Sequence, residues 1–467
     1  MLTHLRIRNF KAWADTGSIR LAPLTVLFGS NSSGKSSLGH LLLALKQTVL
    51  STDRKRALHL GDANSLIDLG TFADCLHGHD MSLPLSFILG WRVPGGITVR
   101  DALASAKAKQ FAGDQIELGA RIVATSTQQP ETEKFRYRVI DSGTNILEVI
   151  HSRKNGGGNL TSEPLRLVHA TGRKWPAEPP EKFYRFTDRT LLRYQNADFL
   201  ADFALQTERV FSQFFYLGPL RKHPERVYQW SGDTPADVGM QGESAIAALL
   251  AATQEGRQLN RGHRQRKQRF DTFIAAWLKE LGVISDFSVK PVAKGRKEYE
   301  VLLRTHEDAP EVKLTDVGFG VSQVLPALVQ AFYAPPNSVI WMEQPEIHLH
   351  PRVQSNLADA LICAVQAWES GSPRGTQLIV ESHSEHFLSR LQRRVAEGTI
   401  AKEDVAIYFV TREGQTAQLE GLGLNDDGEI ENWPENFFGD EMADVAARMR
   451  AVQERRRKAA ALGSEAE

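Results

Sequence analysis

The sequence predicts an α/β protein in which the main sheet is interrupted by a long β-rich insertion. A short apolar run, Leu24 to Phe28, leads into a glycine-rich loop and an apolar helical segment, in the order strand, loop, helix. Strand-like and helix-like segments alternate again after residue 311. Between these two parts, short apolar runs are separated by Gly and Pro, which is typical of antiparallel strands joined by turns.

The individual elements follow from the apolar spacing. Two or three strands are expected before residue 28, and a helix is expected over residues 38–50. The insertion is expected to be β-rich and then helical near residues 195–214, and it shows no sustained heptads that would predict a long coiled coil. The last part predicts helices at 321–333, 352–368 and 384–396 and strands at 338–342, 376–380 and 405–410.

Composition restricts the possible classes of protein. The chain has 467 residues, enough for two or three domains, and its 56 Lys plus Arg balance 56 Asp plus Glu. A net charge of zero does not predict binding to nucleic acid or to a membrane, although local basic patches remain possible. Two cysteines, Cys75 and Cys363, are too few for a disulfide framework and indicate a reducing compartment. No stretch approaches the roughly 20 apolar residues that span a bilayer, so we expect a cytoplasmic protein without a membrane partner.

The glycine-rich loop has the spacing of a phosphate-binding loop, with two glycines separated by four residues and followed by Lys and Ser. Its backbone N–H groups would face phosphates at a helix N-terminus. Lys35 would reach the β- and γ-phosphates, and the Ser36 hydroxyl would bind Mg²⁺. A chance Gly/Ser turn is the alternative, and the flanking strand and helix argue against it. The candidate nucleotide-binding residues are Gly29, Asn31, Ser32, Ser33, Gly34, Lys35, Ser36 and Ser37.

Two later strands end in polar side chains that would complete a nucleotide site. The apolar run Ser338 to Met342 ends in Glu343, whose carboxylate can hold Mg²⁺ directly or through water. The run Gln377 to Glu381 is followed by His383, a side chain that could reach a phosphate.

These motifs together resemble ABC-type ATPases of the RecF/SMC/OLD branch, often called AAA-family ATPases. Leu5–Lys11 is similar to the opening strand of that branch, and Asp316–Gln323 stands where its signature motif belongs. Glu343–Pro351, which includes His350, resembles the Walker B motif and D-loop, and Glu381–Ser384 resembles the switch-histidine loop. The motifs Tyr216–Arg221 and Ile430–Phe438 are similar to a subgroup with an uncharacterised conserved C-terminal domain.

The resemblance implies a fold and a division of the chain. The fold would be a P-loop NTPase of the ABC-ATPase head type, with an insertion between Walker A and the signature and Walker B motifs. Residues 1–80 and 311–420 would be the two halves of the head, residues 81–310 the insertion, and residues 421–467 a tail that docks on the head.

The resemblance also implies an activity and partners. ATP and Mg²⁺ would be the cofactors, and two copies would dimerise head-to-tail. Each ATP would then lie between one P-loop and Gly318, Gly320 and Ser322 of the other copy, where a helix N-terminus suits a phosphate. Such ATPases control a partner effector in bacterial anti-phage defence or act on DNA. No Asp-x-Asp follows residue 400 and the remaining chain is short, so a nuclease effector would be a separate protein.

Two positions depart from the family pattern. The usual Asp-Glu pair of Walker B is Glu343-Gln344 here, and Gln344 can orient water but cannot accept its proton. Either Glu346 supplies the base, or hydrolysis is slow and the protein is mainly a nucleotide-gated switch or scaffold. The candidate catalytic residues are therefore Glu346, Gln344 and His383, with Ser36 and Glu343 holding Mg²⁺. Gly318 also replaces the usual leading Ser of the signature, so contact with the second nucleotide would be mostly through the backbone.

Four further features allow two interpretations each. The histidines His348, His350, His383 and His386 suggest a transition-metal cluster and a metal-dependent phosphohydrolase as an alternative. The basic segment 257–269 could contact nucleic-acid phosphates or simply face water. Arg221 could reach the nucleotide or dimer interface, or anchor a buried carboxylate. Trp433 to Phe438 could dock the tail onto the head or contact a partner.

Overall fold

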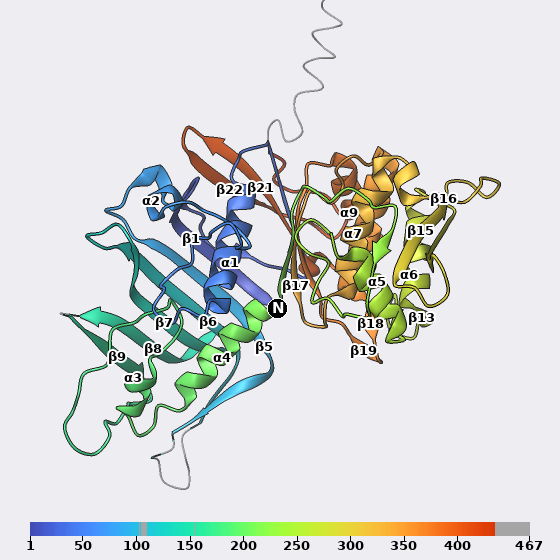
Figure 1. Ribbon diagram of the computed structural model, residues 1–467. Helices are drawn as coiled ribbons and strands as arrows, with labels where there is room; N and C mark the ends of the chain where they lie inside the picture. The colour runs from blue at the N-terminus through green and yellow to red at the C-terminus, as the bar shows by residue number, and fades with distance from the viewer. Residues whose placement is uncertain (102, 104–109, 155, 435–467) are drawn as a thin grey trace, which may run out of the picture.

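The computed structural model describes residues 1–101, 103, 110–154 and 156–434, and a six-stranded sheet lies at its centre (Figure 1). The strand order is β10-β17-β20-β4-β21-β22. The first five strands are parallel, and β22 runs antiparallel to β21. The strands are β4 Leu24–Gly29, β10 Phe214–Leu217, β17 Val339–Glu343, β20 Gln377–Glu381, β21 Val405–Glu413 and β22 Thr416–Leu422. Parallel strands present their carboxyl ends at one edge, which is where ligands bind in open α/β sheets.

Helix α1 (Lys35–Leu50) and a large antiparallel sheet cover one face of this central sheet (Figure 1). The second sheet has the order β2-β1-β5-β6-β7-β8-β9, with β3 paired to β1. Its strands are β1 Leu2–Phe10, β2 Trp13–Asp15, β3 Ile19–Arg20, β5 Leu85–Arg100, β6 Gln110–Ala124, β7 Pro130–Asp141, β8 Thr144–Lys154 and β9 Gly157–Glu163. The helical elements on this side are α2 Phe72–Cys75, η1 His77–His79, α3 Asp188–Leu192 and α4 Phe199–Ser212.

Within the described residues, five helices cover the opposite face: α5 Ala245–Gln254, α6 Phe270–Leu281, α7 Phe319–Tyr333, α8 Pro351–Gln366 and α9 Glu385–Ala396. Two small sheets lie among them. One contains β11 Tyr228–Gln229, β14 Asp286–Pro291, β15 Glu298–Arg304 and β16 Val312–Lys313. The other contains β12 Gln258–Asn260, β13 Gln268–Arg269, β18 Trp368–Glu369 and β19 Ser372–Pro373. The short helices η2 Leu314–Asp316 and η3 Lys402–Asp404 complete the described elements.

The two faces of the central sheet bury separate apolar cores. Leu27 and Trp341 point to the α1 side, whereas their neighbours Val26 and Met342 point to the side of α5 to α9. This alternation is the period of two that a strand imposes on its side chains. Helices α1 and α7 therefore lie on opposite faces of one sheet, as Figure 1 shows.

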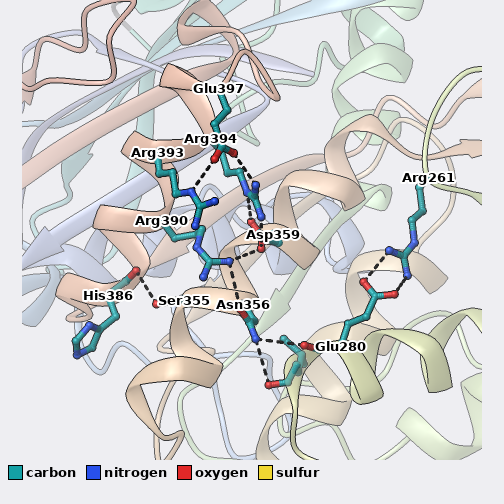
Figure 2. A network of polar contacts seen from close by, with 11 residues as sticks. Arg261, Glu280, Ser355, Asn356, Asp359, His386, Arg390, Arg393, Arg394 and Glu397 are labelled. Carbon is teal, nitrogen blue, oxygen red and sulfur yellow. Dashed lines mark hydrogen bonds and ion pairs between the residues drawn. The ribbon is translucent and has the colours of Figure 1, made fainter.

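Polar side chains connect three of the helices on the second face (Figure 2). Asp359 of α8 accepts hydrogen bonds from Arg390 and Arg394 of α9, at N···O distances between 2.5 and 2.9 Å. Asn356 of α8 donates to the Glu280 carbonyl at the end of α6. Because α9 begins directly after the loop that carries His383, these contacts fix the position of that loop relative to α8.

The helices and strands predicted between residues 321 and 410 agree with the structure to within two residues at their boundaries, except that β21 continues three residues further, to Glu413. Two strands lie in unexpected places. β10 belongs to the central sheet although the sequence placed residues 214–217 in the insertion, because its four residues are buried beside β17. β1 lies before the predicted boundary at residue 80 and pairs with β5, which lies after it. This boundary therefore does not divide the chain between two sheets.

The described part of the chain contains no helix that is long and apolar enough to cross a membrane. Cys75 and Cys363 are buried free thiols. Trp433 is 52% exposed, so this part of the predicted plug is not buried against the described residues. Phe437, Phe438 and the rest of the predicted tail from residue 435 lie outside the described residues.

Candidate functional site

The glycine-rich loop joins β4 to α1 as predicted. Gly29 has φ +140°, and a Cβ there would lie 2.1 Å from the Val410 carbonyl oxygen of the neighbouring strand. Gly34 has φ +110° and precedes the helix. Both positions therefore require glycine. Helix α1 begins at Lys35, so its first N–H groups point out of the helix toward the loop.

Neighbouring residues hold this loop in shape. The Trp13 indole N–H lies 3.1 Å from the Gly34 carbonyl and 2.9 Å from Ser37 Oγ. Lys35 Nζ donates to the carbonyls of Gly29 and Ser30, each at 2.8 Å. Burial lowers the pKa of Lys35. A phosphate would give this ammonium group a charged acceptor in place of two carbonyls.

Two carboxylates converge on Ser36. Its hydroxyl lies 2.7 Å from Glu381 Oε2 and 3.1 Å from Glu343 Oε2. Glu343 and Glu381 are the last residues of β17 and β20 and stand opposite each other in the parallel ladder. The structure thus brings Ser36 and Glu343 together as predicted and adds Glu381, which the sequence indicated only as part of the switch loop.

Two buried aromatic side chains orient these carboxylates. The Tyr216 hydroxyl donates to Glu343 Oε1, and the Trp341 indole N–H donates to Glu381 Oε1 at 2.7 Å. Trp341 lies against Gly39 of α1, where a Cβ would stand 2.7 Å from the ring. The sequence pattern predicts no role for Trp341, and it associates Tyr216 with a motif but not with the metal.

The electrostatics of this cluster follow from burial. Burial raises the pKa of Glu343, and burial together with the Glu343 charge raises the pKa of Glu381 to about 8. Burial and the Glu343 charge also raise the pKa of Tyr216, so its hydroxyl keeps the proton that it donates. Burial and, to a lesser extent, the nearby charge of Lys35 lower the pKa of His383 to about 4.

The candidate catalytic residues lie just beyond the ends of the strands. Glu346 is buried, and its Oε1 accepts from the Ser382 hydroxyl and the His383 backbone N–H, each at 2.8 Å. Its Oε2 has no hydrogen-bond partner among the described residues. Gln344 has φ +45°, and its backbone N–H donates to the Glu381 carbonyl at 2.8 Å. Glu346 is thus attached to the loop that carries His383.

The histidines do not assemble into a metal cluster. Residues 1–434, apart from those few that the structure leaves undescribed, contain no group of three or more His, Cys, Asp or Glu arranged to hold a metal ion. His350 is exposed and caps α8, because its Nδ1 accepts the Arg352 N–H at 3.3 Å. These observations argue against the metal-dependent phosphohydrolase alternative.

The predicted signature residues lie at the start of α7, on the face of the sheet opposite α1. Gly318 is the N-cap residue, and a Cβ there would meet nothing within 4 Å. Gly320 lies beside Leu349 of the D-loop region. Ser322 is buried, one turn into the helix.

Arg221 and two residues of the basic segment make contacts within the protein, whereas Arg264, Arg266 and Lys267 of that segment are exposed. Arg257 of the basic segment binds Glu369 at 2.8 Å, and Arg261 binds Glu280 and stacks over Trp277. Arg221 is 8% exposed and donates to the backbone carbonyl of Glu343 at 3.2 Å. Its hydrogen bond therefore goes to the main chain of β17 and not to the Glu343 carboxylate.

The residues present fit Mg²⁺ and a nucleotide. Ser36, Glu343 and Glu381 offer only hydroxyl and carboxylate oxygens, the hard ligands that Mg²⁺ prefers. When bound, Mg²⁺ would neutralise phosphate charge beside Lys35.

The sheet order, the P-loop and the strand-end carboxylates define a P-loop NTPase of the ABC-ATPase head type. Residues 170–389 match the family described as "AAA domain, putative AbiEii toxin, Type IV TA system". Residues 400–447 match a "Protein of unknown function (DUF3696)" family. Residues 170–389 therefore match an AAA domain and residues 400–447 match that C-terminal domain, which confirms the AAA-family resemblance and the expected conserved C-terminal domain. The first match begins after the P-loop, and the described part of the second supplies β21 and β22.

Solved structures similar to this chain include three SMC heads. An SMC head bound to the C-winged helix domain of ScpA is 10% identical, with 91% of this chain and 98% of that chain covered and a TM-score of 0.41. The SMC head domain from Thermotoga maritima is 11% identical, with 91% and 99% covered and a TM-score of 0.39. An SMC head with an extended coiled coil, bound to the C-terminal domain of ScpA from Pyrococcus furiosus, is 10% identical, with 97% and 99% covered and a TM-score of 0.36. Among curated proteins, none matches the chain.

Proposed function

We propose that the protein is a Mg²⁺-dependent, slowly hydrolysing ATPase that dimerises head-to-tail on ATP. One observation carries this proposal: the P-loop and the signature helix α7 lie on opposite faces of one sheet. A single copy therefore surrounds a nucleotide on one side only, and a second copy, turned head-to-tail, would supply Gly318, Gly320 and Ser322 to the other side. A two-fold dimer of this kind has two equivalent sites.

Through ATP binding and hydrolysis, the protein would control a separate effector, such as a nuclease, or would act on DNA. We infer a role in bacterial anti-phage defence, and the support for it is that residues 170–389 match a family whose description includes "putative AbiEii toxin, Type IV TA system". A cytoplasmic location is consistent with this role.

The signature residues can be tested by mixing two inactive variants. Lys35→Ala removes the cation of the P-loop. Gly318→Asp places a negative charge at the start of α7, in open space that tolerates a side chain. Each variant alone should lose Mg²⁺-dependent ATP hydrolysis. A one-to-one mixture should recover about a quarter of the wild-type rate, because half of the dimers are mixed and each mixed dimer has one intact site.

Gly318→Ala is the matched control, and it should stay close to the wild-type rate because it adds bulk without charge. A mixture that stays inactive would refute sharing of the site between copies. Size-exclusion chromatography with and without ATP, on a Glu346→Gln variant, should show an ATP-dependent dimer.

The candidate base can be tested separately. Glu346→Gln should abolish hydrolysis and retain ATP binding, whereas Gln344→Glu should accelerate hydrolysis by restoring a carboxylate at the usual position. If Glu346→Gln hydrolyses ATP like the wild type, Glu346 is not the base. If the wild type binds ATP and does not hydrolyse it, the alternative of a nucleotide-dependent switch or scaffold replaces this proposal.

A further inference from the structure

The solvent face of the large antiparallel sheet contains a hollow bordered by basic side chains, named here the basic hollow. Its volume is about 290 Å³, close to the lower end of the range for small-molecule pockets. The basic residues that line it are Arg6, Arg8, Arg121, Lys134 and Arg136. Within the described part of the chain, no Asp or Glu belongs to this lining.

The basic hollow lies on the opposite face of this sheet from helix α1. Side chains alternate along β1, so Ile7 enters the core that α1 shares, whereas Arg6 and Arg8 point to solvent. The glycine-rich loop and its nucleotide site belong to the α1 side. A molecule in the basic hollow would therefore be a second ligand, and an inference about it goes beyond the proposed function.

The register of four neighbouring strands, β1, β5, β6 and β7, explains the shape of the basic hollow. Two rows of residues cross these strands, and each row begins and ends with a basic side chain. One row is Arg6, Ile88, Gly119 and Arg136, and the other is Arg8, Ser86, Arg121 and Lys134. Gly119 has no side chain and Ser86 has a short one, so the floor is low between the long basic side chains. β1 and β7 are three strand spacings apart, or about 14 Å, which leaves room for a ligand between the two sides.

Positive charge exceeds negative charge around the basic hollow. Asp15 accepts from both Arg6 and Arg8, at N···O distances between 2.7 and 3.0 Å. Lys134 has no carboxylate within the 4.0 Å of a salt bridge among the described residues. Two positive charges are therefore left without a carboxylate of their own. The other pairs are balanced, with Arg121 on Glu133 and with Arg136 and Arg138 on Glu117 and Glu148.

Carboxylates on three sides limit the size of the ligand. Asp15 lies on the edge strand β2, Glu117 lies further along β6, and Glu133 lies further along β7. A nucleic-acid strand that extended beyond the basic hollow in these directions would approach carboxylates and be repelled by them. A compact anion would contact the basic residues alone. The charge pattern therefore favours a small polyanion over a nucleic acid.

We propose that the basic hollow binds a small molecule that carries a chain of two or more phosphate groups. Arg6 and Arg8 would hold the chain on one side, and Arg121, Lys134 and Arg136 would hold it on the other. An arginine can donate two parallel N–H groups to one phosphate, and a lysine adds a point charge. A single monoanion would compensate only part of the excess charge, whereas a phosphate chain can compensate it fully and contact both sides.

The probe is inorganic triphosphate, as its sodium salt, titrated into the full chain by isothermal titration calorimetry. Because the glycine-rich loop can also bind a phosphate chain, the basic hollow is measured in a Lys35→Ala background, which should retain a single site for triphosphate. Adding Arg8→Gln and Lys134→Gln should weaken binding at least tenfold, because charge-assisted hydrogen bonds are lost on both sides of the chain. Neither change strands a carboxylate, since Asp15 keeps Arg6 and Lys134 has no acidic partner within the described structure.

The matched control removes one arginine and one lysine from the same sheet outside the basic hollow. Arg100 and Lys154 are exposed at the ends of β5 and β8. Arg100→Gln/Lys154→Gln in the Lys35→Ala background changes the net charge by the same amount and should retain the affinity for triphosphate. Equal weakening in the control and in Arg8→Gln/Lys134→Gln would show that net charge alone attracts the anion, and the proposal would be overturned.

Thermal unfolding provides a second measurement. Triphosphate should raise the melting temperature of Lys35→Ala and of the control, but not that of the protein that also carries Arg8→Gln/Lys134→Gln. Sulfate at the same ionic strength should give a smaller shift, because it cannot contact both sides of the basic hollow. Equal shifts with triphosphate and sulfate would contradict the proposal.

Two further titrations identify the source of the phosphate. Tighter binding of ATP than of triphosphate to Lys35→Ala would assign the site to a nucleotide, and weaker binding would assign it to an inorganic phosphate chain. A fluorescein-labelled DNA oligonucleotide tests the excluded class. If Arg8→Gln/Lys134→Gln loses binding of the oligonucleotide and triphosphate binds neither protein, the basic hollow is a nucleic-acid contact and the proposal fails. The proposed function is tested separately, because Arg8→Gln/Lys134→Gln with Lys35 intact should leave Mg-ATP hydrolysis unchanged.

Discussion

The Tyr216 hydroxyl provides the most direct test of how the metal carboxylate is positioned. Tyr216→Phe keeps the buried ring and removes only the O–H that donates to Glu343 Oε1. A hydrogen bond to a charged acceptor contributes about 1.5–3 kcal/mol, so the variant loses a substantial restraint on the carboxylate. Removing an outer-shell partner lowers metal affinity by about 10–100-fold. We expect Mn²⁺ and Mg-ATP affinity to fall within this range.

Tyr408 of β21 supplies a matched control on the same sheet. Tyr216 and Tyr408 are each 8% exposed, and the Tyr408 hydroxyl donates to the Arg20 carbonyl at 2.9 Å and not to a carboxylate. Tyr408→Phe should lose about 0.5–1.5 kcal/mol of unfolding free energy, as expected for a neutral hydrogen bond, and should retain cation affinity.

Isothermal titration calorimetry measures both affinities, and urea unfolding measures stability. If Tyr216→Phe binds the cation and Mg-ATP as tightly as Tyr408→Phe does, the hydroxyl does not orient Glu343 and the argument is refuted.

Two further residues give predictions from packing and charge. Gly39→Ala gains about 1 kcal/mol of helix propensity, but its Cβ would stand 2.7 Å from the fully buried Trp341 ring, at an overpacking cost of about 1–3 kcal/mol. Urea unfolding should show net destabilisation and weaker cation binding, and a more stable variant would show that the indole moves freely. His151 is fully buried, and burial lowers its pKa from 6.5 to about 4, so the folded state favours its neutral form. The contribution of His151 to the free energy of unfolding is therefore complete above pH 6.5. It falls by up to about 3 kcal/mol as the pH drops toward 4. His151→Leu should therefore show a shallower loss of stability between pH 7 and pH 4.5 than the wild type, and an equal slope in the two proteins would refute this account of His151.

The sequence predicts the parts of the fold that local pattern determines. The P-loop, the strand ending at Glu343 and the helices after residue 311 all follow from glycine spacing and apolar periodicity, and all are found. The position of β10 was not predicted, because four apolar residues do not identify the sheet they join. Strand order is decided by long-range packing, which no local pattern contains.

The same reason explains which site residues were missed. Tyr216, Trp341 and Glu381 lie on three neighbouring strands that are far apart in the sequence. Register places Tyr216 opposite Trp341 and Glu343 opposite Glu381, and Trp341 precedes Glu343 by two residues. Residues in register, or two apart, share a face of a sheet, so all of these side chains point toward α1 and Ser36. Given the strand order, Glu381 could have been predicted, because it ends an apolar strand as Glu343 does.

The departure at Gln344 also has a structural basis. Gln344 adopts a left-handed conformation, and its N–H continues the contact between β17 and β20 through the Glu381 carbonyl. The chain then turns, so that Glu346 returns to Ser382 and His383. Gln344 cannot accept a proton, whereas Glu346 Oε2 is buried and has no partner within the described structure. Glu346, the proposed base, is therefore hydrogen-bonded to the loop that carries His383, and we expect any movement of that loop to move Glu346 with it.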